Sequence, residues 1–148
     1  MFKHILVSTD GSKLSGKAIR TAARLAGATG AKLTGVYVIP PYLPPMYGEG
    51  MMYVPAMSES KYRSAAKRAG KKALATVEIE AQTAGAPYGA VLLAASNPWE
   101  GIVRTAKSKK CDLIVMASHG RRGLAGLLLG SETTKVLTHS KIPVLVCR

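Results

Sequence analysis

The sequence predicts an open, doubly wound α/β fold, in which a parallel sheet carries helices on both faces. Short apolar runs of strand length alternate with stretches of helical periodicity along the chain. Near-continuous apolar strands are typical of parallel sheets that are covered on both sides. The chain has 148 residues, a length that suits one domain with a single hydrophobic core. It is 47% hydrophobic but only 5% aromatic, so that core must be mainly aliphatic. We therefore expect a single domain over residues 1–148.

The first half of the chain predicts two strands joined by one helix. Residues 4–9 form the first strand, Ser12 caps a helix that continues to about Thr29, Gly30 ends it, and residues 32–39 form the second strand. Apolar residues recur in the helix at steps of three and four, which places them on one face. They are Leu14, Ala18, Ala22 and Leu25.

Residues 40–58 differ in composition from the rest, with five prolines and four methionines. Proline at this density excludes a regular helix or a central strand, so a long loop is expected. Long loops in compact domains are commonly lids or mobile segments. The methionines have no ligand spacing, which favours an apolar loop over a soft-metal site.

A long basic helix is predicted over residues 59–83, ended by Gly85. Its apolar side is mostly alanine, together with Leu74, Val77 and Ile79. Its basic residues are Lys61, Arg63, Lys67, Arg68, Lys71 and Lys72. A solvated helix face is the favoured interpretation of this cluster, because a nucleic-acid surface usually interleaves aromatic residues and only Tyr62 is nearby.

The remaining elements follow the same alternation. A third strand lies within residues 88–96, and Asn97-Pro98-Trp99-Glu100 predicts a capped start for a helix that ends near Lys109. In that helix Asn97 acts as the cap, Glu100 reaches back to it, and Trp99 packs. The fourth strand covers residues 112–117. A last helix is expected over residues 131–139, and a last strand over residues 143–147.

Charge and cysteine content narrow the class of protein. The formal net charge is +13, which indicates either a polyanion partner or general solubility, and its spread along the chain favours solubility. Cys111 and Cys147 form no CxxC or Cys/His pattern, so buried free thiols are expected. No apolar run approaches the roughly 20 residues of a membrane span and no secretory signal precedes the first strand, which predicts a cytoplasmic protein.

Two short motifs predict an anion-binding crevice. Ala117-Ser118-His119-Gly120 follows the fourth strand, and nine residues later Gly130-Ser131 begins a helix. Glycine lets the backbone approach a ligand closely, and the first N–H groups of a helix attract phosphate. Asp10-Gly11-Ser12 follows the first strand, where an acidic residue can accept hydrogen bonds from a ribose or help to hold a metal-bound phosphate. Alone, Asp10 could equally be a turn residue that caps the first helix, and the loop after the fourth strand favours the ligand role.

Candidates for catalysis are weaker. His119 could contact phosphate or act as an acid or base, but a solvent-exposed loop side chain is the favoured interpretation. Arg121 and Arg122 could neutralise phosphate or be solvated, and the sequence leaves both open. Nothing completes a nucleophilic or hydrolytic set, so no catalytic residue and no protein metal site is predicted.

These motifs resemble those of the universal stress protein family. The resemblance covers essentially the whole chain, from Lys3-His4-Ile5-Leu6-Val7 at the start to Pro143-Val144-Leu145-Val146 at the end. Its ATP-binding members carry a glycine, two residues, a second glycine, nine residues, and then glycine with serine or threonine. Gly120 and Gly130-Ser131 match this pattern. Ala117 stands at the first glycine and departs from it by one methyl group.

The resemblance implies a strand order of 3-2-1-4-5 and a set of ligand contacts. Phosphates would lie on Gly120, Gly130, Ser131 and Thr133, and the ribose and phosphate track on Ala117 and Ser118. Asp10 would face the ribose with Thr9 beside it, and Val38 would meet adenine through its backbone. The ligand implied is ATP, with Mg²⁺ or Mn²⁺. The resemblance also implies a homodimer through the last strand, Pro143 to Cys147.

Three functional hypotheses follow. The first is a stress-response protein that binds ATP and acts as a regulatory or sensing dimer with little or no hydrolysis, because no base or transition-state arginine is evident. The second is an interaction module of the same fold that binds no nucleotide, for which Ala117 is the supporting residue. The third is a basic polyanion or nucleic-acid binder.

Overall fold

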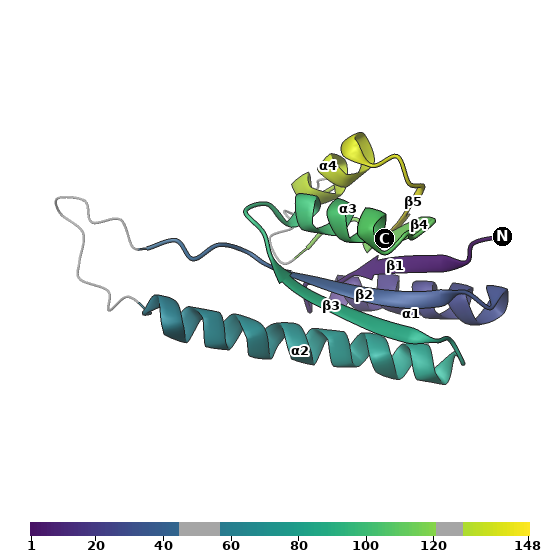
Figure 1. Cartoon of the computed structure of the whole chain (residues 1–148), viewed down its shortest axis with the longest axis horizontal. Helices are drawn as coiled ribbons and strands as arrows, with labels where there is room; N and C mark the ends of the chain where they lie inside the picture. Colours follow the sequence, from purple (N-terminus) through teal and green to yellow (C-terminus); the bar gives the residue numbers. More distant parts are fainter. Residues whose placement is uncertain (45–56, 121–128) are drawn as a thin grey trace.

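The computed structural model describes residues 1–44, 57–120 and 129–148, and these form five strands and four helices in strict alternation with one long connection (Figure 1). In chain order the elements are β1 His4–Ser8, α1 Lys13–Thr29, β2 Lys32–Ile39, α2 Glu59–Thr83, β3 Tyr88–Ala94, α3 Pro98–Ser108, β4 Leu113–Ala117, α4 Ser131–His139 and β5 Val144–Cys147. The boundaries predicted for α1, β2, α2 and α4 are confirmed, and the others differ by one or two residues at an end.

The strands form one parallel sheet in the order β3-β2-β1-β4-β5, which confirms the predicted fold class and strand order. The chain builds the sheet outward from β1 to β3, crosses over, and continues on the other side with β4 and β5. The strand order therefore reverses between β1 and β4. This is the switch point at which doubly wound sheets bind ligands, beyond the carboxyl ends of the strands.

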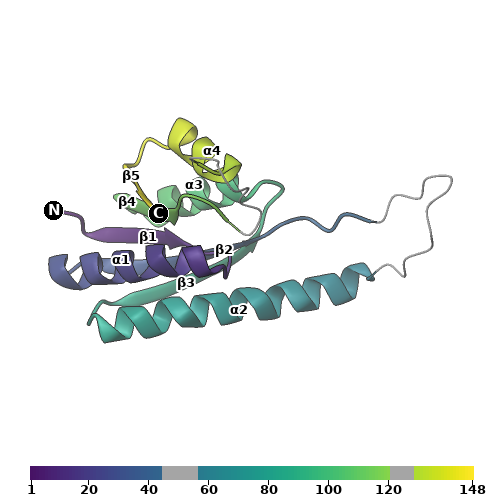
Figure 2. The ribbon, with the colours of Figure 1, turned by 180° about the vertical axis from the view of Figure 1, so that it is seen from behind.

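Two helices cover each face of the sheet. The alternate side chains Ile5, Val7 and Leu33 pack with α1 and α2, whereas Leu6 and Val36 pack with α3 and α4. Figure 2 shows α1 and α2 in front of the sheet, with α3 and α4 beyond it. Because helices cover both faces of the sheet, the side chains on both sides of each central strand must be apolar. This explains the continuous apolar runs in the sequence.

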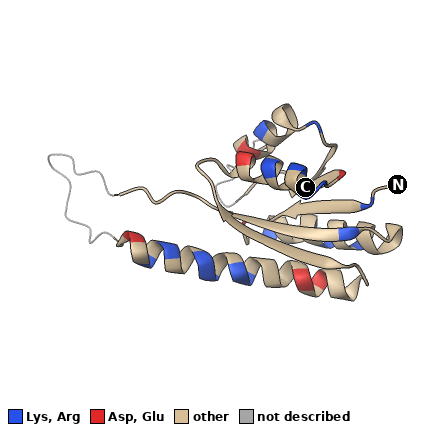
Figure 3. Ribbon diagram, viewed as in Figure 1, with Lys and Arg blue, Asp and Glu red and all other residues tan. Residues whose placement is uncertain are grey.

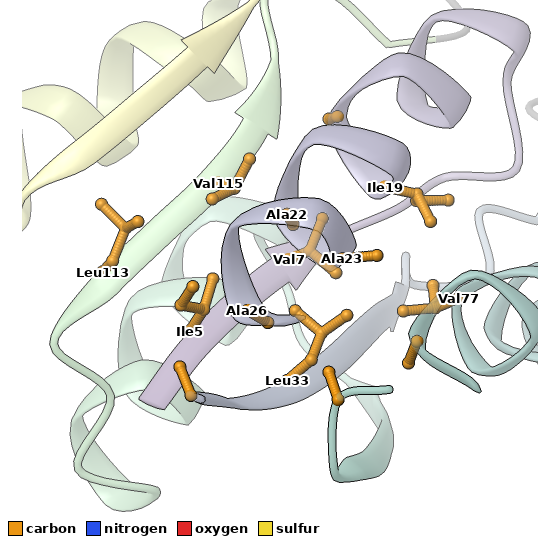
Figure 4. Packing of buried hydrophobic residues seen from close by; sticks show 14 of the residues in the cluster. Ile5, Val7, Ile19, Ala22, Ala23, Ala26, Leu33, Val77, Leu113 and Val115 are labelled. Atoms are coloured by element: carbon orange, nitrogen blue, oxygen red, sulfur yellow. The ribbon is translucent and has the colours of Figure 1, made fainter. Parts of the chain in front are cut away.

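The face under α1 is closed by small residues. Ala18, Ala22, Ala23 and Ala26 are buried against β1 and β4 (Figure 4), so the helix axis can lie close to the sheet. The Ser12 hydroxyl accepts a hydrogen bond from Ser15 N at 3.2 Å and caps the helix, as predicted. Gly30 ends it with a φ of 68°, a left-handed conformation that favours glycine.

The apolar side of α2 differs from the prediction at one residue. Leu74 and Val77 are buried, but Ile79 is 62% exposed. Two residues beyond Val77 correspond to about 200° around an α-helix, which turns Ile79 to the opposite side. Its placement on the apolar side was therefore wrong. The N-terminal half of α2 extends past the sheet (Figure 1), so only the C-terminal half has a full apolar face.

The start of α3 also differs from the prediction. The Asn97 side chain makes no capping bond to the helix backbone, and its amide donates instead to Glu100 Oε1 at 2.8 Å. The cap comes from another helix, because Trp99 N donates to Glu132 Oε2 on α4 at 2.8 Å. The carboxylate that stabilises the first turn of α3 is thus 33 residues away in the chain. Trp99 packs against the hydrophobic core on this face of the sheet, as expected, and its ring centroid lies 4.3 Å from that of His139.

Other expectations can be placed briefly. Cys111 is buried and Cys147 half-buried, and both are free thiols. None of the described helices is long and apolar enough to cross a bilayer. Most of the predicted Pro- and Met-rich loop, residues 45–56, lies outside the described residues, as do Arg121 and Arg122.

Candidate functional site

The turn after β1 brings Asp10 to the carboxyl edge of the sheet. Thr9 N donates to Val36 O at 3.0 Å, which continues the β1–β2 ladder one residue past the strand. Asp10 Oδ1 then accepts a hydrogen bond from Ser12 N at 2.9 Å, and Gly11 adopts a φ of 79° that lets the chain turn into α1. The Thr9 hydroxyl is buried in the same turn, 3.1 Å from the Ser15 hydroxyl.

Asp10 meets the loop that follows β4. A β-carbon built on Gly120 would stand 2.6 Å from Asp10 Oδ2, closer than real β-carbons approach other atoms. The two motifs that the sequence predicts as opposite sides of a crevice are therefore in direct contact here. Gly120 itself is exposed, so the carboxylate and the glycine backbone both border on solvent.

Ala117 and Ser118 form the base of this loop. Ala117 is 8% exposed and its methyl group belongs to the apolar cluster under α1. Ser118 is buried and its backbone is held on both sides, since Ser118 N donates to Cys147 O on β5 and Ser118 O accepts from Gly130 N, both at 2.7 Å. The loop is thus tied to the sheet edge before it reaches Gly120.

His119 is less exposed than the sequence suggests. Its Nδ1 lies 3.1 Å from Ser118 Oγ, and its Nε2 is buried and has no hydrogen-bond partner among the residues that the structure describes. The expectation of a solvent-exposed loop side chain is wrong at this nitrogen. The ring is half-buried because Gly130 packs beside it: a β-carbon on Gly130 would lie 3.8 Å from His119 Cδ2.

The start of α4 lies against the same loop. Thr133 is buried, and its hydroxyl donates to Ala117 O at 3.0 Å and Ser118 O at 3.2 Å, which joins the first turn of α4 to the end of β4. Ser131 is the exposed first residue of the helix. Thr133, to which the family resemblance assigns a phosphate contact, therefore has its hydroxyl committed to backbone carbonyls.

The N-termini of α1 and α4 differ in how their N–H groups are satisfied. At α1, Ser12 caps the first turn and the Asp10 carboxylate accepts from Ser12 N. At α4 the N-cap residue is Gly130, which has no side chain to cap the first turn. The acidic residue of that turn, Glu132, is directed to α3 and to Lys135, 3.5 Å away. The α4 terminus therefore offers its backbone N–H groups to an anion more readily than α1 does.

Val38 lies apart from the other predicted contacts. It is on β2, and its side chain packs against α3: a β-carbon on Gly101 would lie 2.8 Å from Val38 Cγ2. The structure thus brings together Asp10, Gly120, Ser118, Gly130 and Thr133, with Ala117 beneath them. Val38 stands on the far side of β1, one strand away from that group.

One contact of functional interest could not be found from the sequence. The Glu132 bond to Trp99 N couples the first turn of α4, which borders the crevice, to the start of α3. Glu132 stands directly after Gly130-Ser131, where an acidic residue at a helix start is ordinarily assigned to its own helix dipole. Only the packing of α3 against α4 identifies its actual partner.

Fold and site together define an open α/β protein with a glycine-containing loop at the switch point of its sheet. The sequence model that defines the universal stress protein family matches residues 1–148, and the chain belongs to that family. It is 34% identical to a universal stress protein of Thermus aquaticus over 148 residues, with 100% of both chains covered. It is also 34% identical over 149 residues to universal stress protein YxiE of Bacillus subtilis, again with both chains fully covered.

Solved structures agree with this membership. The chain shares 28% identity and a TM-score of 0.72 with a universal stress protein crystallised in complex with cAMP, over 99% of this chain and 97% of that one. Nucleotide binding therefore occurs among relatives of this chain. A family member from Burkholderia pseudomallei shares 26% identity and a TM-score of 0.74, over 97% of this chain and 94% of that one.

Proposed function

We propose that this chain binds ATP at the crevice between the carboxyl ends of β1 and β4 and acts as a regulatory or sensing protein in a stress response. The observation that carries the proposal is the contact of Asp10 with Gly120, next to an α4 terminus whose cap is a glycine. A carboxylate suited to ribose hydroxyls thus stands beside N–H groups suited to phosphate. The nucleotide in a 28%-identical relative supports the ligand class.

Each predicted contact has a place in this proposal. The backbone of Gly120, Gly130 and Ser131 binds the phosphates. Gly120 and Ser131 are exposed, whereas Gly130 is half-buried and its N–H already donates to Ser118 O. Asp10 faces the ribose, and Val38 meets adenine through its backbone. Thr9, Ala117, Ser118 and Thr133 line and support this track, and the buried hydroxyls of Thr9 and Thr133 argue that these two act by holding the loops in place.

The methyl group of Ala117 does not argue against the nucleotide. It packs within the apolar cluster under α1 and is 8% exposed, so little of it borders the crevice. The alternative, an interaction module that binds no nucleotide, depended on this methyl group crowding the ligand. The burial of the methyl group favours the nucleotide-binding hypothesis.

We further propose that a divalent cation, Mg²⁺ or Mn²⁺, enters with the phosphates. Among the described residues no three His, Cys, Asp or Glu side chains gather into a cage. Asp10 is the carboxylate at the crevice, and it fits a cation whose other ligands are phosphate oxygens and water, as Mg²⁺ prefers. We expect little or no hydrolysis, and the cation then serves to neutralise phosphate charge.

The test is equilibrium binding of labelled ATP to the wild-type chain, Gly130→Val and Gly89→Val. A β-carbon on Gly130 would lie 3.3 Å from Ser118 O and 3.4 Å from His119 Cα, both backbone atoms, so we expect the larger valine side chain to shift the loop relative to α4. Gly89 on β3 is a matched control, because the nearest atom to its β-carbon would be Lys32 Cε at 3.6 Å, an ordinary contact.

We expect saturable binding by the wild type and Gly89→Val and its loss in Gly130→Val, with native mass spectrometry showing the added mass of the nucleotide. Absence of saturable binding by the wild type at millimolar ATP rejects the proposal and leaves the interaction module. Equal binding by all three proteins places the nucleotide elsewhere.

We also propose a homodimer through the last strand, Pro143 to Cys147. β5 stands at the end of the strand order and pairs only with β4 within the described sheet. Its residue Leu145 is 38% exposed. An edge strand with an exposed apolar side chain is a ready surface for pairing with a second copy.

A further inference from the structure

A pocket that is open to solvent lies away from the crevice, at the carboxyl ends of β2 and β3 and against the N-terminal half of α2. Its volume is about 520 Å³, within the range of small-molecule pockets. We call it the tyrosine pocket. It is lined by Ile39, Pro40, Pro41, Tyr42, Glu59, Tyr62, Arg63, Lys67, Ala94, Ala95 and Ser96.

Two tyrosines form the aromatic wall of the tyrosine pocket. Tyr62 on α2 and Tyr42 after β2 have ring centroids 5.5 Å apart and planes tilted by 47°. The Tyr62 hydroxyl donates to Pro40 O and the Tyr42 hydroxyl donates to Met57 O, each at 2.7 Å. These bonds fix both rings beside an apolar floor. The two aromatic residues are 20 positions apart in the sequence, so only the fold places them together.

Basic residues surround this wall. Arg63 and Lys67 line the tyrosine pocket, and Lys71 continues their row because residues four apart are neighbours on a helix. Lys61, Arg68 and Lys72 lie further round the same half of α2 and are exposed. Figure 3 shows blue segments gathered on the N-terminal half of α2, with red at its first turn, where Glu59 lies, and again toward its C-terminal end, where Glu78 and Glu80 lie.

This charge is poorly balanced within the described residues. Among the described residues, the one ion pair that this row makes joins Arg63 to Glu59; the two atoms are 2.7 Å apart and both side chains are largely exposed. An exposed pair of this kind contributes little and is easily exchanged for another anion. From Arg63 to Lys71 the helix rises about 12 Å, which is long enough to follow about two phosphates of an extended strand.

We propose that the tyrosine pocket and the basic row Arg63, Lys67 and Lys71 bind single-stranded nucleic acid. One base enters the pocket and stacks on the Tyr62 ring, and the adjoining phosphates lie along the row. Proteins that bind single strands combine aromatic stacking with a positively charged track in this way. A duplex presents no unstacked base that could enter such a pocket. A flat anionic membrane presents no base that could stack on Tyr62.

This surface adjoins the proposed ATP crevice along β2 but uses the opposite face of the sheet. Ile39, which lines the tyrosine pocket, belongs to the apolar cluster under α2, whereas its neighbour Val38 packs on α3 across the sheet. Asp10, Gly120 and Gly130 do not line the pocket. The two ligands should therefore bind independently, and the failure of one proposal leaves the other intact.

The experiment measures binding of fluorescent 12-nucleotide single strands of dT and rU to the full chain over a salt series. The test variants are Arg63→Gln/Lys67→Gln and Tyr62→Leu. Arg104→Gln/Lys107→Gln on α3 is the control for lost charge, and Tyr62→Phe is the control for the ring. Thermal unfolding of each variant verifies the fold.

We expect saturable, salt-dependent binding by the wild type. Tyr62→Leu should weaken it by roughly 5- to 100-fold, the effect of one lost base stack, while Tyr62→Phe stays close to wild type. Arg63→Gln/Lys67→Gln should lower the slope of log K against log salt by about 1.4, because two phosphate contacts are lost. The α3 control should leave the slope unchanged.

Four results would overturn the proposal: no binding at low salt, equal affinity for duplex DNA, equal losses in the α2 and α3 charge variants, or displacement of the strand by saturating ATP. Binding to vesicles of anionic lipid that is insensitive to Tyr62→Leu, with no single-strand binding, would assign the basic row to a membrane surface instead.

Discussion

The carboxylate of Asp10 occupies the space that any side chain at Gly120 would need. A β-carbon at position 120 would lie 2.6 Å from Asp10 Oδ2, while Asp10 Oδ1 is held by Ser12 N at 2.9 Å. A side chain at position 120 would therefore force the Asp10 carboxylate to move, and this constraint comes from close approach and not from backbone conformation. The contact links the turn after β1 to the loop after β4, which are more than 100 residues apart in the chain.

Replacement of Gly120 by alanine should weaken ATP binding by about tenfold or more. The new methyl group and the Asp10 carboxylate cannot both keep their positions, so either the ribose contact or the phosphate loop moves. The unfolding free energy should change by less than about 1 kcal/mol, because Gly120 is exposed. Isothermal titration with ATP and chemical denaturation measure the two effects.

A double-mutant cycle with Asp10→Ala identifies the cause. If the clash is responsible, Gly120→Ala has little further effect once the carboxylate is removed, and the two losses are not additive. Additive losses would mean that Gly120 acts independently of Asp10, and the contact would then be incidental to binding.

The sequence predicts the elements of this fold well and the contacts between them poorly. Apolar runs and helical periodicity locate α1, β2, α2 and α4 at their observed ends, because each of those signals is local. The cap of α3 and the tyrosine pair depend on residues brought together by packing. Asn97 has the right type and position for a cap, yet Glu132 takes that role from a neighbouring helix.

The candidate site shows the same division. Asp10, Gly120 and Gly130 follow from strand ends and glycine positions, and the structure brings them together. The burial of His119 Nε2 and the commitment of the Thr133 hydroxyl to two carbonyls do not follow, since both depend on how α4 packs on β4. Residue type predicts what a side chain can do, and packing decides what is left free.

Ala117→Gly tests whether the extra methyl group crowds the ligand. We expect ATP affinity to change by less than about fourfold, which is under 1 kcal/mol, because the methyl group lies in the core under α1. Stability should fall by roughly 1 kcal/mol through lost packing and added chain freedom. Ala90→Gly on β3 is exposed and controls for chain freedom alone. A tenfold tightening specific to Ala117→Gly would show crowding.

Thr133→Val should destabilise the chain by about 1–3 kcal/mol. Valine keeps the volume but leaves Ala117 O and Ser118 O without the hydroxyl that now donates to them in a buried position. Thr138→Val removes a similar bond to Thr134 O at an exposed site and should change stability by less than about 0.5 kcal/mol. If urea denaturation shows equal losses of stability for Thr133→Val and Thr138→Val, the buried bonds of the Thr133 hydroxyl do not stabilise the fold more than an exposed bond does.

Leu145→Lys should convert the proposed dimer into a monomer. Leu145 is 38% exposed on the edge strand β5, and a charge there opposes pairing with a second copy. Leu137→Lys on α4, where leucine is 41% exposed, is the matched control and should remain dimeric. Sedimentation velocity distinguishes the states. A monomeric wild type, or a dimer that survives Leu145→Lys, contradicts pairing through β5.

Asp112 should make the stability of the fold depend on pH at its acid end. Its carboxylate accepts hydrogen bonds from Lys3 N at 2.7 Å and His4 N at 3.0 Å, which ties the start of β1 to β4. Burial alone would raise the pKa of Asp112, but these backbone N–H groups outweigh it and the pKa is lowered from its ordinary value of 3.8. A carboxylate whose pKa is lower in the folded state stabilises the fold above its unfolded-state pKa. That contribution is lost as pH falls through the folded-state pKa.

Asp112→Asn should therefore lower the unfolding free energy by about 0.5–1 kcal/mol at pH 7. The amount is modest because the two hydrogen bonds to Asp112 lie near water. The difference from wild type should shrink as pH falls below about 4 and vanish once the wild-type carboxyl is protonated. Glu78→Gln removes an exposed carboxylate on α2 and should have a smaller effect at every pH. Urea titrations at stepped pH measure this, and a difference that persists unchanged at low pH would show that Asp112 stabilises the strand ends without its charge.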